Sequence, residues 1–365
     1  MRIVVVGGGY AGLACLARLA RLVPDAERHL VDPARWHLRR TLLHETLRRP
    51  LADLRAGFGP IARRWGFRHH AAEIRWDPEQ LRRWSQDNTL RLGMRELEFD
   101  ALVLATGLPG LRQRRSRSRT PPVPLESLAT GPGARAYKRL ASSPGPVWVV
   151  GAGASGLQCL FELAAASDGD TPLGLVEASE SILPAEPARL RRVVWRRLEA
   201  LGVDVRLGTR FEGTARGRIR LRGRDGPESL PSEGVLLCTG ASGRPSDADA
   251  SGRVLHRGRP LPGIFAAGDC ARWRDVRFDA ATAQTAVRKG RHVAESVVQV
   301  LAGEEPEQWD ARLLGYFLSL GPGDAVGWLF SRAALVKGLP AVAAREAVEA
   351  RWDLLLAGVD SFGAL

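Results

Sequence analysis

The sequence of 365 residues lacks the features that mark several large protein classes. Its cysteines are too few and too dispersed for the disulfide framework of a small secreted protein. They are Cys15, Cys159, Cys238 and Cys270. No apolar run reaches the roughly 18 residues of a membrane-spanning helix. The start has no basic, cleavable leader, so we expect no signal peptide. The length suits two domains, or three small ones.

Lysine is also scarce, since only three of the 53 basic residues are lysines and the net charge is +13. An arginine excess attracts nucleic acid, an anionic membrane surface or an acidic protein. Alternatively, the arginines are spread over a solvated surface and carry no function. No nucleic-acid-binding module is visible, so we expect no nucleic-acid partner. The densest run, residues 112–119, lies between prolines and is expected to form a loop that is solvated or guards a ligand entrance.

The chain begins with a pattern typical of a nucleotide site. Residues 3–6 form a β-branched apolar run, which predicts a buried parallel strand. A G-x-G-x-x-G follows, in which Gly7 permits a tight turn, Gly9 lets the backbone approach a pyrophosphate and Gly12 permits close helix packing. A helix then begins, and its N-terminus attracts phosphate. The next expected strand ends in Asp32, 20 residues after Gly12, where a carboxylate binds a ribose.

The whole unit repeats 144 residues later. Gly151, Gly153 and Gly156 reproduce the glycine pattern, and Glu177 follows the second expected strand 21 residues after Gly156. Cys15 and Cys159 occupy equivalent helix positions and are expected to be small core residues. Two complete units predict two dinucleotides bound by two Rossmann-like domains.

Three more segments are expected to approach the cofactors. An apolar strand precedes Thr106 and Gly107 in the first unit, and another precedes Gly240 in the second. A third strand, at residues 264–267, ends in Gly268-Asp269, where a carboxylate can bind polyol hydroxyls.

These motifs resemble those of the two-dinucleotide-binding flavoproteins related to the pyridine nucleotide–disulfide oxidoreductases. They are most similar to type II NADH:quinone oxidoreductases. The shared patterns are V-V-G-G-G-x-x-G-L, H-L-x-x-x-L-L, A-A-G-D-C-A and T-A-Q-x-A, at 5–13, 37–43, 266–271 and 282–286. The resemblance implies an α/β fold with FAD- and NAD(P)-binding Rossmann-like domains, the second inserted in the first, and a short helical C-terminal tail. We expect the FAD domain at 1–120 and 256–305, the NAD(P)H domain at 121–255 and the tail at 306–365.

By this resemblance the first unit holds FAD, with Tyr10 and Ala11 in its phosphate loop and Asp269 on the ribityl chain. Ala283 and Gln284 begin a helix that faces the isoalloxazine, and Glu177 binds the NADH ribose. Because an acid there repels a 2′-phosphate, NADH is favoured over NADPH, although arginines near residue 189 lie close by in the sequence. The nicotinamide then delivers a hydride to flavin N5.

Some residues depart from the related families. Disulfide reductases carry C-x-x-x-x-C after the ribose acid, but residues 33–60 contain no cysteine. A redox-active disulfide is therefore excluded, and sulfide oxidation is disfavoured. Gln158 replaces the glutamate usual near the quinone pocket, and Arg288 replaces the last glutamine of A-Q-x-A-x-Q. Gln158, Gln284 and Arg288 are our catalytic candidates. His44 and Glu45 are weaker candidates for a proton relay, and no metal-ligand spacing is present.

The tail allows two interpretations. Apolar residues recur through 325–336, and we expect a helix there that lies on a membrane or packs in the core or a homodimer. A further helix is expected over 341–356. The tail is also shorter than the family's usual membrane-anchoring extension.

We therefore expect a cytoplasmic or membrane-peripheral FAD enzyme that oxidises NADH and reduces a quinone or another small acceptor. One alternative is a reductase of a soluble electron-carrier protein, because such carriers are usually acidic and this chain is basic. Another is a slow flavoprotein redox sensor or binding module.

Overall fold

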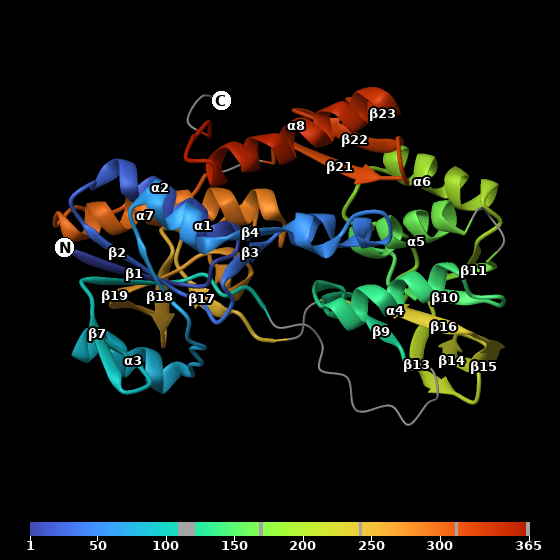
Figure 1. Cartoon of the computed structure of the whole chain (residues 1–365), viewed down its shortest axis with the longest axis horizontal. Coiled ribbons are helices and arrows are strands. Elements are labelled where there is room, and N and C mark those ends of the chain that lie inside the picture. The colour runs from blue at the N-terminus through green and yellow to red at the C-terminus, as the bar shows by residue number, and fades with distance from the viewer. Residues whose placement is uncertain (109–120, 168–170, 241–242, 311–312, 363–365) are drawn as a thin grey trace.

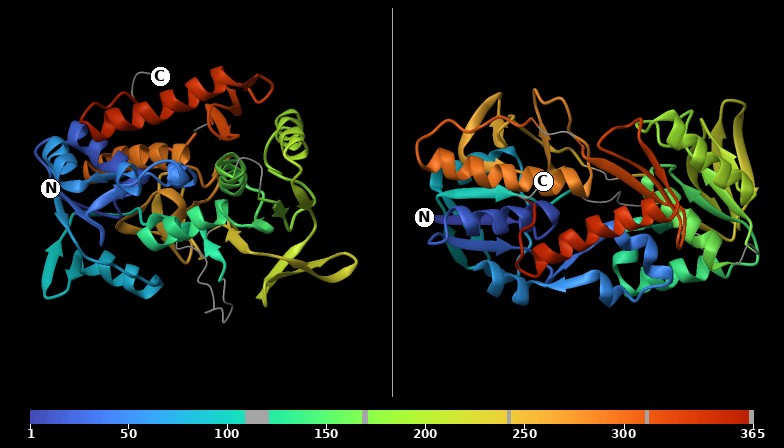
Figure 2. Two further views of the ribbon diagram at one scale, coloured as in Figure 1. Left: turned by 45° about the vertical axis from the view of Figure 1, so that its right-hand side comes forward. Right: turned by 90° about the horizontal axis from the view of Figure 1, so that it is seen from above.

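The computed structural model of the chain describes residues 1–108, 121–167, 171–240, 243–310 and 313–362. Two α/β domains lie side by side, and a C-terminal segment runs along one side of both (Figures 1 and 2). The arginine run at 112–119 lies outside the described residues. No helix within the described ranges has the length and apolar character needed to cross a membrane.

The first domain is built on an eight-stranded sheet with the order β20-β17-β18-β19-β8-β1-β2-β5. Strand β1 pairs in parallel with β2 on one side and β8 on the other. Because both of its faces are covered, it is apolar at nearly every position, as expected of a central parallel strand. The first part of the domain contains β1 (Arg2–Val6), α1 (Tyr10–Leu22), β2 (Glu27–Val31), β3 (Trp36–Leu38), η1 (Arg40–Leu47), η2 (Leu51–Leu54), β4 (Arg55–Gly57), α2 (Phe58–Trp65), β5 (Arg68–His70), α3 (Pro78–Asp87), β6 (Thr89–Leu92), β7 (Arg95–Glu98) and β8 (Ala101–Leu104).

The chain returns to this sheet after the second domain. The returning elements are β17 (Ser246–Ala248), β18 (Arg253–His256), β19 (Arg259–Ala266), η4 (Gly268–Cys270), β20 (Ala271–Trp273) and α7 (Ala283–Leu301). Strand β17 therefore joins the first sheet before residue 256. We propose that the inserted domain ends between β16 and β17.

The second domain repeats the parallel arrangement in a sheet with the order β12-β11-β10-β16-β9. An antiparallel sheet of β13, β14 and β15 packs against one face through Ile219 and Leu221. The elements are β9 (Val123–Pro124), η3 (Leu125–Ala129), α4 (Gly131–Ala141), β10 (Val147–Val150), α5 (Ala154–Ala166), β11 (Leu173–Val176), α6 (Ala188–Ala200), β12 (Asp204–Arg206), β13 (Arg210–Ala215), β14 (Arg218–Gly223), β15 (Gly226–Pro231) and β16 (Gly234–Leu237).

The C-terminal segment forms three antiparallel strands and one helix. They are β21 (Gly315–Ser319), β22 (Ala325–Leu329), β23 (Leu335–Lys337) and α8 (Leu339–Leu356). The predicted helix at 341–356 is confirmed, but the one at 325–336 is wrong. A Cβ on Gly327 would lie 2.2 Å from the Tyr316 carbonyl oxygen of β21, so the close strand pairing requires glycine. In a run this short, helical and strand patterns are hard to tell apart.

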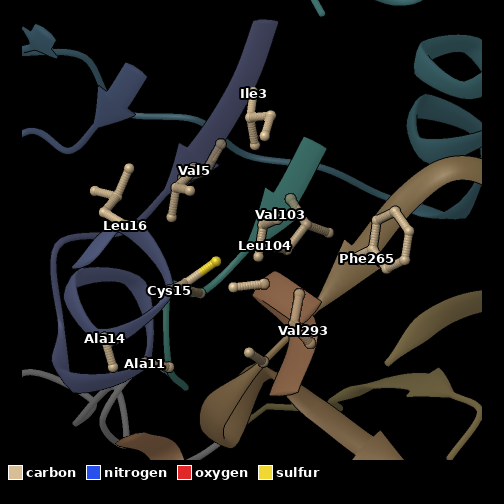
Figure 3. Close-up of a cluster of buried hydrophobic side chains, with 14 of the residues drawn as sticks. Ile3, Val5, Ala11, Ala14, Cys15, Leu16, Val103, Leu104, Phe265 and Val293 are labelled. Atoms are coloured by element: carbon tan, nitrogen blue, oxygen red, sulfur yellow. The ribbon is translucent and has the colours of Figure 1, made fainter. Parts of the chain in front are cut away.

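The first core lies between the sheet and two helices that pack closely on it. Cys15 of α1 and Val293 of α7 lie beside Val103, Leu104 and Phe265 of the sheet (Figure 3). Cys15 and Cys159 are both fully buried, which confirms the prediction that they are core residues.

Candidate functional site

The first glycine-rich loop joins β1 to α1, and its three glycines meet different surroundings. A Cβ on Gly7, whose φ is +108°, would lie 2.4 Å from the Ala105 carbonyl oxygen. A Cβ on Gly12 would lie 1.9 Å from the Gly7 carbonyl oxygen, so the packing of the protein itself requires both glycines. At Gly9 the nearest such atom is 4.0 Å away. The open space at Gly9 fits a phosphate that approaches the backbone closely.

The second glycine-rich loop has the same geometry. Gly151 has a φ of +105°, and a Cβ there would lie 2.3 Å from the Cys238 carbonyl oxygen. A Cβ on Gly156 would lie 1.9 Å from the Gly151 carbonyl oxygen, whereas one on Gly153 would have no atom of the described residues within 4 Å. Both loops therefore leave the middle glycine open, as expected where a phosphate approaches the backbone closely.

Asp32 and Glu177, the acids expected to bind the two riboses, are each hydrogen-bonded to the adjacent glycine-rich loop. Asp32 accepts a hydrogen bond of 2.7 Å from the Gly8 N–H, and Glu177 accepts one of 2.7 Å from the Ala152 N–H. Both carboxylates are half-buried at the carboxyl edge of their sheet. This is the position from which an acid reaches an adenosine ribose in Rossmann-like domains.

The Gly268-Asp269 turn lies between two helices of the first domain. A Cβ on Gly268, whose φ is +75°, would lie 3.1 Å from Cβ of Ala11 in α1 and 3.9 Å from Cβ of Ala286 in α7. The Asp269 side chain is exposed, but nearby protein atoms partly desolvate it and raise the pKa of its carboxyl group. The Lys289 ammonium opposes that rise. The structure thus places Asp269 beside the first glycine-rich loop.

Helix α7 begins close to this turn. Thr282 caps it, accepting a hydrogen bond of 3.1 Å from the backbone N–H three residues on, and Ala283 is its first residue. The Oε1 atom of Gln284 is buried without a hydrogen-bond partner among the described residues, which fits a donor supplied by a bound cofactor. Arg288 lies one turn further along the helix. Gln158 lies on α5 of the second domain, and the catalytic roles of these three residues stay predictions.

The other expected cofactor-binding residues lie at the same sheet edges. Thr106 and Gly107 follow β8, and Gly240 follows β16 with a φ of +83°. Tyr10 is the first residue of α1, and its ring packs against Trp352 of α8 with centroids 4.8 Å apart. Contact of each residue with a cofactor stays a prediction.

Lys289 is a further candidate residue of the site, and it was not predicted from the sequence. Its side chain is buried in α7, forms an ion pair with Asp279, and donates a 3.1 Å hydrogen bond to the Ala271 carbonyl oxygen. Its ammonium also lies 4.9 Å from the Trp273 ring centroid. The signal in the sequence was a lysine, rare in this chain, directly before Gly290 in the helix that begins at Ala283.

His44 and Glu45 belong to a buried charged network. Glu45 pairs with Arg345 of α8 at 3.0 Å and with Arg48 at 2.9 Å, and Arg48 also reaches Glu162 of α5 at 3.1 Å. The network therefore joins both domains and the C-terminal helix. Burial lowers the pKa of His44 to about 3, so its ring is neutral near pH 7. A proton-relay role for this residue stays a prediction.

All four cysteines are free thiols. Cys270 is buried, its Sγ lies 3.3 Å from the Leu104 and Ala267 carbonyl oxygens, and burial raises the pKa of its thiol. These surroundings disfavour a reactive thiolate. Across the described residues there is no group of three or more side chains suited to a metal ion.

Comparison with known proteins agrees with this geometry. Residues 1–290 match the family described as pyridine nucleotide-disulphide oxidoreductase. A type II NADH:quinone oxidoreductase of Staphylococcus saprophyticus is 23% identical over 399 residues, covering 98% of this chain and 96% of its own length.

Solved structures show the same fold. The sulfide:quinone oxidoreductase of Aquifex aeolicus superposes with a TM-score of 0.81 at 14% identity, over 99% of this chain and 93% of its own. NDH2 of Plasmodium falciparum, solved with NADH, gives a TM-score of 0.77 at 11% identity, over 98% and 96%.

The family match confirms the predicted two-dinucleotide flavoprotein architecture, with FAD and a pyridine nucleotide as cofactors. It extends through both glycine-rich loops and the start of α7. The chain therefore belongs to the pyridine nucleotide-disulphide oxidoreductase family.

Proposed function

We propose that this chain is an FAD-dependent oxidoreductase that takes a hydride from NADH and passes electrons to a quinone or another small acceptor. The observation that carries the proposal is the pair of matching loops. Each has an open middle glycine and an acid hydrogen-bonded to the loop. Two such sites in one chain suit two dinucleotides that exchange electrons.

The residues bind and orient the two cofactors. When bound, FAD supplies the redox chemistry, accepting a hydride from the nicotinamide and passing electrons onward. The first loop and Asp32 hold the pyrophosphate and ribose of the flavin nucleotide, and Asp269 accepts hydrogen bonds from its ribityl hydroxyls. Gln284, with its unpartnered Oε1, lies at the start of the helix that faces the isoalloxazine.

We favour NADH over NADPH because a carboxylate that binds the ribose, as we propose for Glu177, repels a 2′-phosphate. Its two carboxylate oxygens accept hydrogen bonds from the backbone N–H groups of Ala152 and Ser179, at 2.7 and 2.8 Å. A pocket of about 400 Å³ lies between the loop that follows Glu177 and helix α6, and Arg191 and Arg192 of α6 line part of it. We propose that Glu177 outweighs these arginines in the choice of nucleotide.

A quinone is the favoured acceptor because the relatives that match nearly the full chain are named quinone oxidoreductases. Gln158 cannot exchange a proton, so protons for quinone reduction must come from another group or from water. Helix α8 leaves the side chains of Leu339, Val348 and Leu354 exposed. We propose these residues for peripheral contact with a membrane or a second copy of the chain.

A second candidate function is reduction of an acidic electron-carrier protein. The net charge of +13 favours such a partner, because opposite charges steer association. High salt would slow reduction of a carrier but not of a soluble quinone.

An acceptor screen tests both proposals. We expect the purified protein to contain FAD, and NADH to bleach the flavin absorption. The rate of reduction of a soluble quinone should depend little on salt. Turnover with a ferredoxin-like carrier that falls steeply with salt, and no turnover with quinone, would favour the second candidate. A protein whose flavin neither NADH nor NADPH reduces would contradict both and leave the sensor or binding-module alternative.

A further inference from the structure

Helix α8 docks on the first domain through both apolar and polar side chains. Trp352, Leu355 and Leu356 are buried in the core of that domain. Four side chains of the helix also make polar contacts with it: Arg345, Glu349, Trp352 and Asp353. Because apolar burial has no preferred direction, these polar contacts help to fix the position of α8 on the domain.

Those contacts fall on one short segment, residues 37–45, which follows Asp32 in the chain. Arg345 donates a 3.0 Å hydrogen bond to Glu45, and Asp353 forms an ion pair with Arg39. Glu349 is hydrogen-bonded to Thr41. Figure 1 shows α8 running from the C-terminal strands toward the first domain, where the chain ends.

Trp352 extends the contact to the first glycine-rich loop. Its indole Nε1–H donates to His37 Nε2 at 3.1 Å, and His37 Nδ1 lies 3.0 Å from the Gly8 carbonyl oxygen. An indole N–H only donates and a carbonyl oxygen only accepts. His37 is therefore neutral, with its proton on Nδ1. Burial lowers the pKa of His37 to about 4, in agreement with a neutral ring.

The bond to Gly8 also fixes the next peptide group. In a planar trans peptide the C=O and the following N–H point in opposite directions. With the Gly8 carbonyl turned toward His37, the Gly9 N–H points away from His37. That N–H has no hydrogen-bond partner in the part of the chain that the structure describes, and Gly9 borders the open space described above. The orientation suits a donor to a pyrophosphate oxygen.

The second loop provides an internal comparison. Ala152 occupies the position equivalent to Gly8, and its carbonyl oxygen accepts a 3.2 Å hydrogen bond from the Leu183 N–H. Leu183 belongs to the loop that follows Glu177, so the donor is a backbone group of the same domain. Of the two loops, the first is held by the His37 side chain, which is hydrogen-bonded to the C-terminal helix, and the second is held by a backbone N–H.

We propose that His37 and Trp352 are positioning residues for the flavin nucleotide. Through them, docked α8 holds the Gly8–Gly9 peptide in its phosphate-binding orientation and slows release of FAD. This inference rests on the proposed function in one respect, that the first loop holds FAD. It makes the C-terminal helix part of the FAD site, whereas the Ala152 carbonyl of the second loop is held by the Leu183 N–H of its own domain.

The experiment measures the rate of FAD release from holoprotein by the fluorescence of free flavin. Trp352→Phe removes the indole N–H, and His37→Leu removes both hydrogen bonds. His37→Asn keeps an N–H donor near the position of Nδ1. Leu354→Ala, at an exposed position of α8, is the matched control. We expect FAD release to be about tenfold faster than wild type for Trp352→Phe and faster still for His37→Leu. For His37→Asn the rate should fall between those of His37→Leu and the wild type.

Two further measurements separate positioning from folding. The thermal midpoint of each variant stripped of FAD should stay close to that of similarly stripped wild type, and the NADH dissociation constant of the holoprotein should not change. The double variant Trp352→Phe/His37→Leu should release FAD no faster than His37→Leu alone, because the two residues act in one chain of hydrogen bonds.

Wild-type release rates in both Trp352→Phe and His37→Leu would overturn the inference. The inference would also be overturned if His37→Asn released FAD as fast as His37→Leu and both variants lost the same thermal stability. His37 and Trp352 would then have only a structural role. Wild-type protein that binds no FAD would instead overturn the proposed function itself, and this inference with it.

Discussion

The two glycine-rich loops have the same backbone design but differ in what holds them. In both, the middle glycine borders open space and the ribose acid accepts a hydrogen bond from the loop. The Gly8 carbonyl is bonded to His37, which reaches α8, whereas the Ala152 carbonyl is bonded to the neighbouring Leu183 N–H.

This difference matches the different demands on two redox cofactors. A flavin stays bound through many turnovers, whereas a nicotinamide dinucleotide must enter and leave in each one. A loop tied to a remote helix suits the first demand, and a locally held loop suits the second. The comparison predicts that the two sites respond separately to substitution.

The largest separate effect is expected from the middle glycines. Gly153→Val should abolish NADH binding, by at least about 100-fold, while FAD stays bound; Gly9→Val should abolish FAD binding. In the part of the chain that the structure describes, no atom lies within 4 Å of the new Cβ at Gly153, and the nearest at Gly9 is 4.0 Å away, so neither Cβ clashes there. Flavin content and NADH titration measure both outcomes. Full reduction of the flavin by NADH in Gly153→Val would contradict the domain assignment.

A smaller effect is expected at the second ribose acid. Glu177→Gln removes the charge that we propose binds the ribose and repels a 2′-phosphate. We expect KM for NADH to rise about tenfold and the preference over NADPH to shrink by a similar factor, with FAD content unchanged. Steady-state kinetics with both nucleotides checks this. An unchanged NADH to NADPH ratio would show that Glu177 does not select the nucleotide.

Buried histidines should make the first domain sensitive to acid. Burial lowers the pKa of His37 to about 4 and that of His44 to about 3, whereas both titrate near 6.5 in the unfolded chain. As the pH falls below about 6.5, the unfolded state binds these protons first, so stability drops until the folded-state pKa values are reached. His37→Asn should lessen the loss between pH 7 and 5, by up to about 2 kcal/mol, in urea unfolding. Equal losses in variant and wild type would mean that His37 ionises freely in the fold.

The smallest effect is expected from Cys270. Because its thiol is buried and bonded to carbonyl oxygens, Cys270→Ser should keep the rate of flavin reduction by NADH within about twofold. Stopped-flow absorbance measures that rate. Loss of quinone reduction in this variant alone would point to thiol chemistry that the proposed function does not contain.

The sequence was sufficient to predict the two glycine-rich loops and their acids. Gly7 and Gly12 are required by contacts within one strand–turn–helix unit, so their spacing in the sequence is enough to identify them. The contact between His37 and Trp352 joins residues more than 300 positions apart and follows no local pattern. The strands β22 and β23 were missed for a related reason, because their partner β21, and not their own apolar spacing, determines their structure.

The central claim is that one chain binds a flavin and a nicotinamide dinucleotide at separate sites that exchange a hydride. Anaerobic titration of purified holoprotein with NADH, followed by the long-wavelength absorption band of the flavin, tests it most directly. We predict complete bleaching by one NADH per bound FAD in the wild type and no bleaching in Gly153→Val, which still contains its flavin. Retained bleaching in that variant, or none in the wild type, would contradict the account.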